Sequence, residues 1–153
     1  MSRVLGALVD AACLLLMVAL SVDILLGVFS RYVLVQTFTW YDEVARAVFV
    51  WMVFLGAAAG VRRQAHFRLH LAVDRLPARA QHGVEVFGLL VVIGFAAVLV
   101  QQGAALVELG RFQQTPVMGM PKSWIYAAMP VGGVLIGLFA LAPLWRALRR
   151  AIA

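Results

Sequence analysis

Four long runs of apolar residues, separated by short polar segments, dominate the chain. They cover residues 5–29, 44–61, 84–107 and 124–144. Each is close to the roughly 20 residues that a helix needs to cross a hydrocarbon core of about 30 Å. The runs lack the alternation of a transmembrane β-barrel, and helices satisfy their backbone polar groups internally. The pattern therefore predicts an all-α integral membrane protein, a single domain of residues 1–153 with four transmembrane helices.

Composition excludes a soluble domain. Apolar residues (AVILMFWYC) make up 64% of the chain and charged residues 13%, whereas soluble domains have about 45–50% and about 25%. Disordered, collagen-like and coiled-coil classes are excluded by the same composition. The only cysteine, Cys13, cannot form an intramolecular disulfide, so a disulfide scaffold is excluded as well.

The net charge of +6 comes mostly from basic residues that flank the apolar runs. This placement is typical of topology signals, and no nucleic-acid partner is expected. Nine Lys and Arg residues lie in the N-terminal segment, the loop between the second and third runs, and the C-terminal tail, against three in the other two loops. The excess predicts that both termini are cytoplasmic. The first run is too long for a signal peptide, and we expect it to be a permanent span.

The loop between the second and third runs mixes basic and apolar residues from 66 to 76. We expect an amphipathic helix on the inner membrane surface, in contact with lipid and ended by Pro77. The apolar alternation over 67–73 leaves a strand as the alternative, although its edges would be unpaired. The i,i+4 spacing of His66 and His70 can bind a metal on a helix, but a further set of ligands is missing and no metal site is predicted.

Charged residues gather around the loop after the first run. Thr39 and Asp42 resemble a capping box at the start of the second helix. Arg46 has the spacing to pair with Asp42 at i,i+4 and with Glu43 at i,i+3. An arginine inside a span seeks a partner, so Asp23 of the first run is the candidate for an intramembrane ion pair with Arg46. The cluster is either a capped helix start with a local ion pair or an ion or substrate site.

Other polar and small residues favour a structural role. Asp10 lies near the inner end of the first run and Asp23 near the outer end, on different helix faces, so neither has the central position expected in a proton-coupled transporter. The sequence has no nucleotide-binding or catalytic motif, and no enzyme activity is expected. Two small-residue motifs permit close helix contact, within the chain or with a partner; they are Gly56-x-x-x-Gly60 and Gly133-x-x-x-Gly137.

A series of motifs runs through residues 28–132. It consists of Arg31-Tyr32, Trp40–Arg46, Phe49–Ala57, Arg62-Arg63, His66–Leu69, Asp74–Pro77, Gln114-Thr115-Pro116, Met118, Pro121, Trp124, Tyr126 and Pro130. Together these motifs resemble the small membrane subunit of TRAP transporters, the DctQ-like family. The block from Trp40 to His66 is the most specific part of the resemblance.

The resemblance implies a tripartite secondary transporter of a bacterial inner membrane, served by a periplasmic solute-binding protein. In this family a large multi-helix permease subunit carries the substrate and coupling-ion sites, coupling is commonly to sodium, and substrates are mostly organic acids such as dicarboxylates and sugar acids. This chain is then a non-catalytic scaffold for symport, without a cofactor of its own. Its candidate structural and interface residues are Arg31, Trp40, Asp42, Glu43, Arg46, Trp51, Gly56, Gly60, His66, Pro121 and Trp124.

Two other functions remain open from the residues alone. A self-sufficient, homo-oligomeric four-helix transporter requires an essential acid, which would be Asp10 or Asp23. A haem or quinone anchor is less consistent with the sequence, because the four runs contain no histidine.

Overall fold

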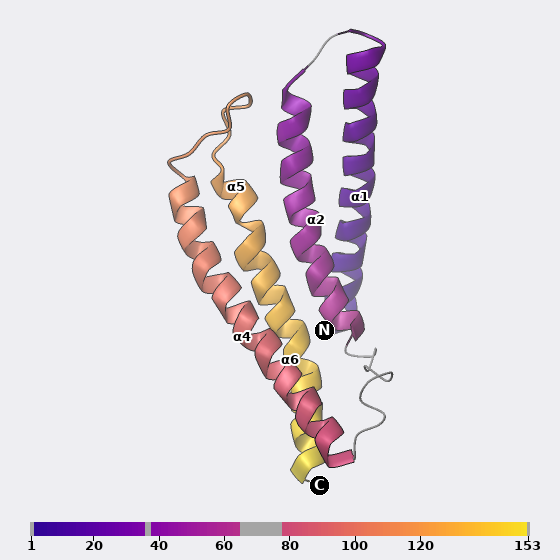
Figure 1. Ribbon diagram of the computed structural model, residues 1–153, viewed down its shortest axis with the longest axis vertical. Helices are drawn as coiled ribbons and strands as arrows, with labels where there is room; N and C mark the ends of the chain where they lie inside the picture. The colour runs from indigo at the N-terminus through magenta and orange to yellow at the C-terminus, as the bar shows by residue number, and fades with distance from the viewer. Residues whose placement is uncertain (1, 36–37, 65–77, 153) are drawn as a thin grey trace.

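The computed structural model describes residues 2–35, 38–64 and 78–152 (Figure 1). Its helices are α1 (Ser2–Tyr32), α2 (Trp40–Gln64), α4 (Ala78–Gly110), α5 (Ser123–Tyr126) and α6 (Ala128–Ile152). Within these described ranges, four segments are long and apolar enough to cross a membrane, and α5 and α6 together form the last of them. The predicted four-helix membrane fold is confirmed. The expected amphipathic segment 66–76, with His66 and His70, lies outside the described residues.

The helices form a row rather than a closed bundle. α1 packs against α2, α2 against α6, and α6 against α4, so that α1 and α4 are the two edges of the row in Figure 1. Both chain termini lie toward the same end of the row, named here the terminal end. The opposite end, where α1 and α4 finish and α2 and α5 begin, is named the hairpin end.

Small residues allow α6 to approach both of its neighbours closely. A Cβ atom added at Gly132 would lie 2.7 Å from the Cβ of Phe54 in α2, and one added at Gly133 would lie 3.0 Å from the carbonyl oxygen of Ala96 in α4. The buried core continues this pattern and is rich in alanine; it comprises Val9, Ala58, Ala59, Ala96, Leu99, Ile136 and Phe139. Packing of this kind is typical of membrane helices, because surrounding lipid provides no hydrophobic driving force between them.

The last span starts with the single turn of α5 and continues after Ala127 as α6. Pro130 is the third residue of α6. In the first turn of a helix no backbone amide proton is needed, so this proline does not interrupt the span.

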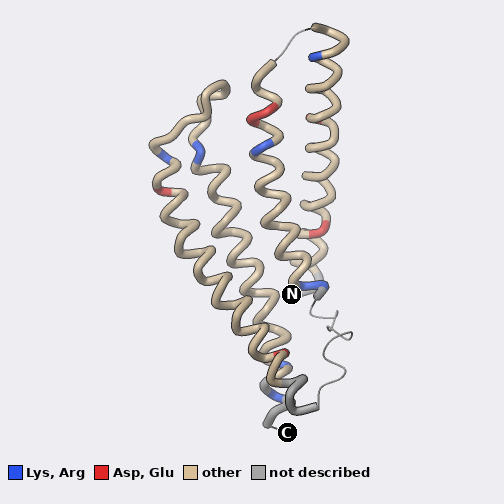
Figure 2. Tube along the Cα trace, in the orientation of Figure 1, with Lys and Arg blue, Asp and Glu red and all other residues tan. Residues whose placement is uncertain are grey.

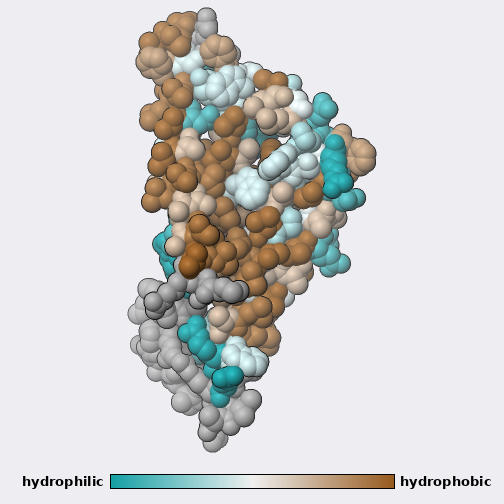
Figure 3. Space-filling model, turned by 180° about the vertical axis from the view of Figure 1, so that it is seen from behind, coloured by the Kyte–Doolittle hydropathy of each residue, from teal (hydrophilic) through white to brown (hydrophobic). Residues whose placement is uncertain are grey.

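Most apolar side chains point away from the core. Only 6% of the apolar stretch of α1 is buried, against 33% of that of the last span. Figure 3, seen from behind, shows hydrophobic atoms along α1 at the left edge of the molecule. Charged residues gather toward the ends of the helices (Figure 2). The exposed middle surface is suited to contact with lipid tails or with another membrane protein.

Candidate functional site

The segment between α4 and α5 folds into a hairpin, named here the 111–122 hairpin. The backbone N–H of Thr115 donates to the carbonyl oxygen of Met120 at 2.8 Å. Gly119 has a φ of 65°, a left-handed conformation that glycine adopts without strain. The tip of the hairpin is therefore a defined turn.

Glu43, in the first turn of α2, holds this tip in place. Its carboxylate oxygens accept the backbone N–H groups of Val117 at 2.8 Å and Met118 at 3.0 Å. Hydrogen bonds to a charged acceptor are stronger than those between neutral groups. The sequence pattern pointed to Glu43 as a partner of Arg46, and it carried no local signal for a contact some 74 positions away.

Tryptophans join the same region of α2 to the start of the last span. The indole Nε1–H of Trp51 donates to the carbonyl oxygen of Trp124 at 3.2 Å. At the first turn of α2, the rings of Trp40 and Tyr41 lie with their centroids 3.8 Å apart. Pro121 forms an isolated β-bridge with Gln114 in the hairpin. Trp51, the twelfth of the 25 residues of α2, thus contacts Trp124, which follows the hairpin that contains Pro121.

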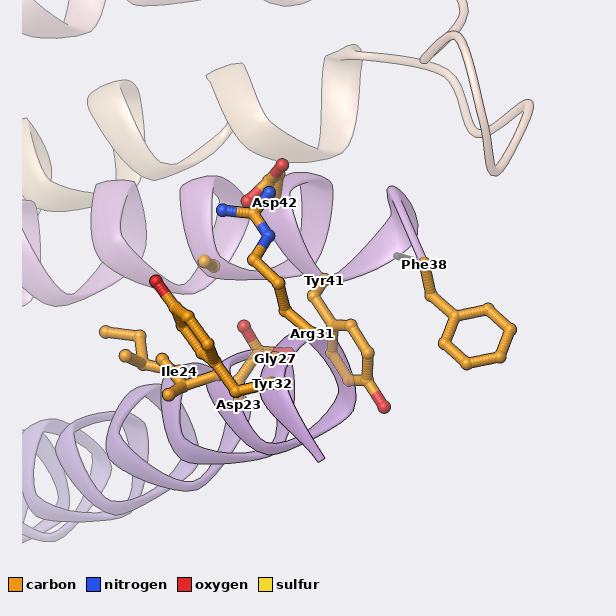
Figure 4. Close-up of a pocket in the computed structure, with 10 residues that line it drawn as sticks. Asp23, Ile24, Gly27, Arg31, Tyr32, Phe38, Tyr41 and Asp42 are labelled. Carbon is orange, nitrogen blue, oxygen red and sulfur yellow. The ribbon is translucent and has the colours of Figure 1, made fainter. Parts of the chain in front are cut away.

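A cavity of about 280 Å³ opens between α1 and α2 at the hairpin end (Figure 4). Two acids, Asp23 of α1 and Asp42 of α2, contribute to its wall together with Arg31 and the rings of Tyr32 and Tyr41. Asp23 is 8% exposed, whereas Arg31 and Asp42 are exposed. The cavity therefore combines charged groups with aromatic rings beside a deeply placed carboxylate.

The predicted ion pair between Asp23 and Arg46 is not formed. Asp23 faces the cavity, and Arg46 is exposed and is not part of the cavity wall. Among the described residues, Arg46 also forms no ion pair with Asp42 or Glu43. Within that same part of the chain, Asp23 has neither a hydrogen bond nor an ion pair.

At the terminal end, α1 is joined to α2 by charge. The carboxylate of Asp10 binds the guanidinium of Arg62 and, at 3.2 Å, that of Arg63. The Arg62 guanidinium also lies 5.9 Å from the ring centre of Phe139 in α6, within cation–π range. No partner of Asp10 was predicted from the sequence. The signal was available, because antiparallel helices place a residue near the start of α1 level with residues near the end of α2.

The two glycine motifs have different surroundings. Gly133 contacts α4 closely, and a Cβ at Gly137 would lie 3.7 Å from the Cβ of Ala96. A Cβ at Gly56 or Gly60 would meet none of the described residues within 4 Å. The motif in α6 therefore packs within the chain, whereas the one in α2 leaves open space.

The remaining question for this site is whether it holds a metal. The part of the chain that the structure describes contains no group of three or more His, Cys, Asp or Glu side chains that could hold a metal ion. His66 lies outside the described residues. What the geometry does provide is a set of anchors between helices and one buried acid that faces a cavity.

Several proteins of TRAP transporters are similar in sequence to this chain. The sequence model of the DctQ component of tripartite ATP-independent periplasmic transporters matches residues 20–150. The chain is 30% identical over 124 residues to the sialic acid TRAP transporter small permease protein of Vibrio cholerae, covering 79% of this chain and 70% of that protein. A putative TRAP transporter small permease protein of Haemophilus influenzae is 21% identical over 127 residues, with 83% and 79% covered. The sialic acid TRAP transporter permease protein of Haemophilus influenzae is 26% identical over 109 residues, which are 71% of this chain but 18% of that protein.

Proposed function

The chain belongs to the DctQ family of small TRAP transporter permease subunits, and we propose that it is the non-catalytic scaffold of such a transporter. The low burial of the four spans supports the scaffold role. In the apolar stretches of its four spans only 6% to 33% of the chain is buried, while the polar anchors join its own helices and hairpin. Helices that cover one another so little offer a large surface on which another membrane protein can pack.

The partner in this proposal is a large permease subunit in the same inner membrane. The match to the sialic acid permease of Haemophilus influenzae supports this partner. In that protein, the segment similar to this chain is only 18% of a much longer chain. A periplasmic solute-binding protein completes the transporter and delivers the solute. The large subunit binds the solute and the coupling ion, sodium, and this chain needs no cofactor.

We infer that the solute is an organic acid of the sugar-acid or dicarboxylate type. The names of two relatives, which refer to sialic acid, support the sugar-acid class. In this proposal specificity resides in the binding protein and the large subunit.

The orientation proposed here places the terminal end in the cytoplasm and the hairpin end in the periplasm. The basic residues near the terminal end, among them Arg62, Arg63, Arg146 and Arg149, support this orientation through the positive-inside rule. Cysteine labelling tests it in a Cys13→Ser background. A membrane-impermeant maleimide added to cells with a permeabilised outer membrane is expected to label Gln114→Cys, and to label Arg149→Cys only after lysis. The reverse pattern contradicts the orientation.

The scaffold function is tested with the native complex. The chain carrying a C-terminal tag is purified in a mild detergent, and we expect one larger hydrophobic chain to copurify at a fixed ratio. In liposomes, uptake of labelled sialic acid or a C4-dicarboxylate in the presence of the binding protein is expected to require both membrane chains. Recovery of the small chain alone, as a homo-oligomer that catalyses uptake, contradicts the proposal and favours a self-sufficient transporter. Uptake by the large chain without the small one contradicts the scaffold role.

A further inference from the structure

Asp23 is a buried acid within a candidate membrane span, and the described residues give it no counter-charge. It lies inside the span Val4–Tyr32, eight residues before Arg31, which is about 12 Å along a helix axis. Its side chain faces the cavity between α1 and α2 (Figure 4). Acids within a span almost always pair with another group, because an isolated charge in the hydrocarbon region is costly.

The cations that the structure describes do not provide this counter-charge. Arg62 and Arg63 bind Asp10 at the terminal end, and Arg46 is not part of the cavity wall. Arg31 is part of that wall, but in Figure 4 its side chain extends toward Asp42 on α2. Among the described residues, Asp23 is left without an ion pair.

The chemistry of the cavity favours a long basic side chain as its occupant. Two carboxylates against one guanidinium attract a cation, and the rings of Tyr32 and Tyr41 can contact one through their faces. A volume of about 280 Å³ is large for a bare ion and suits the end of a side chain. We expect a lipid headgroup to reside near Arg31, at the end of the candidate span, whereas Asp23 lies about 12 Å back along the axis of α1.

We propose that this cavity is the socket for a lysine or arginine of a membrane helix in the large permease subunit, which forms an ion pair with Asp23. The inference rests on the proposed function, because it takes that subunit as the partner. The face of α1 and α2 near the hairpin end is then part of the interface between the subunits. α1 packs mainly against α2 and is the least buried span, so this face is accessible to a partner helix. The apolar stem of a long basic side chain can lie along Ile24 and Val28 while its charge reaches the carboxylate.

The first test compares two acid-to-amide substitutions in the complex of both full-length membrane chains. Asp23→Asn changes the side chain little in size and leaves the partner's cation unpaired, so we expect the dissociation constant of the complex to rise by about thirtyfold or more. The matched control is Glu108→Gln, which neutralises an exposed acid toward the end of α4 and is expected to leave the constant unchanged. Asp23→Glu retains the charge and is expected to retain most of the affinity. Equal dissociation constants for the wild-type chain and Asp23→Asn overturn the inference.

The second test leaves Asp23 intact, so it does not depend on how the variant folds. A photoreactive residue replaces Val28, an exposed member of the cavity wall, and the cross-linked peptides are identified by mass spectrometry. We expect a membrane-spanning peptide of the large subunit that contains a lysine or arginine. Exchange of that residue for glutamate, combined with Asp23→Lys, is expected to restore binding. Cross-links only to lipid, only to a second copy of this chain, or only to large-subunit peptides without a basic residue overturn the socket.

If the wild-type chains do not associate at all, the proposed function fails as well; if they associate and these tests are negative, only the socket fails.

Discussion

Replacement of Gly132 by alanine tests whether the close approach of α6 to α2 stabilises the row of helices. The added Cβ would lie 2.7 Å from the Cβ of Phe54 and 3.2 Å from two of its ring atoms. Carbon atoms in favourable contact are about 3.5–4.0 Å apart. The Cβ of Phe54 is attached to the backbone and cannot rotate away, so the two helices have to separate locally. Overpacking of this kind typically costs about 1–3 kcal/mol.

The matched control is Gly56→Ala in α2, where the added Cβ would meet no atom of the described part of the chain within 4 Å. Alanine is favoured over glycine in a helix interior by up to about 1 kcal/mol, and both variants gain this contribution. The difference between their free energies of unfolding therefore isolates the packing cost. We expect Gly132→Ala to be less stable than Gly56→Ala by about 1–3 kcal/mol.

The assay is reversible unfolding in mixed micelles with increasing mole fraction of SDS, followed by far-ultraviolet circular dichroism and by tryptophan fluorescence. The two probes have to report the same transition for the free energies to be comparable. Equal stabilities of the two alanine variants, or a more stable Gly132→Ala, would contradict a tight contact between α6 and α2. The α2–α6 contact would then have room for a methyl group, contrary to the packing at Phe54.

Three further predictions concern the polar anchors. Glu43→Ala removes the acceptor of two backbone amides in the 111–122 hairpin, so hydrogen exchange of these amides is expected to accelerate; unchanged exchange contradicts the anchor. Asp10→Asn and Arg62→Gln each break the same ion pair, so we expect both to lower the melting temperature and the double variant to add little; additive effects contradict direct pairing. Trp51→Phe removes the hydrogen bond to the carbonyl of Trp124 and is expected to cost about 1 kcal/mol in SDS unfolding; wild-type stability in this variant contradicts that bond.

The spans could be predicted from the sequence because a bilayer imposes a length and an apolar composition on each of them. Residues 44–61, for example, fall inside α2, whose ends extend into the more polar interfacial residues. The glycine motifs predicted less of the packing, because a small residue permits a close contact but does not indicate which helix makes it. Gly56 belongs to a predicted motif and has open space, while Gly132 belongs to neither motif and makes one of the closest contacts.

The pairing of charges in the site was the part that local spacing could not predict. Positions three and four residues apart suggested that Arg46 pairs with Asp42 or Glu43, yet the carboxylate of Glu43 binds amides of a hairpin from another part of the chain. That choice depends on where the hairpin lies after α4, α5 and α6 have packed. The ion-pair partner of Asp10 was easier to predict, because Asp10 and Arg62 lie at the same level once α1 and α2 are taken as antiparallel.

The two ends of the α1–α2 pair are built differently, and this difference bears on how the subunit becomes a rigid scaffold. At the terminal end, Asp10 joins α1 to α2 with groups of the chain itself. Near the hairpin end, Gly27 lies beside Tyr41, where an added Cβ would be 3.6 Å away, an ordinary van der Waals contact, and the cavity adjoins it. A partner that fills the cavity adds its binding free energy to the stability of this end by mass action. The hairpin half of α1 is therefore expected to be held more firmly in the complex than in the isolated chain, with the largest gain around Asp23.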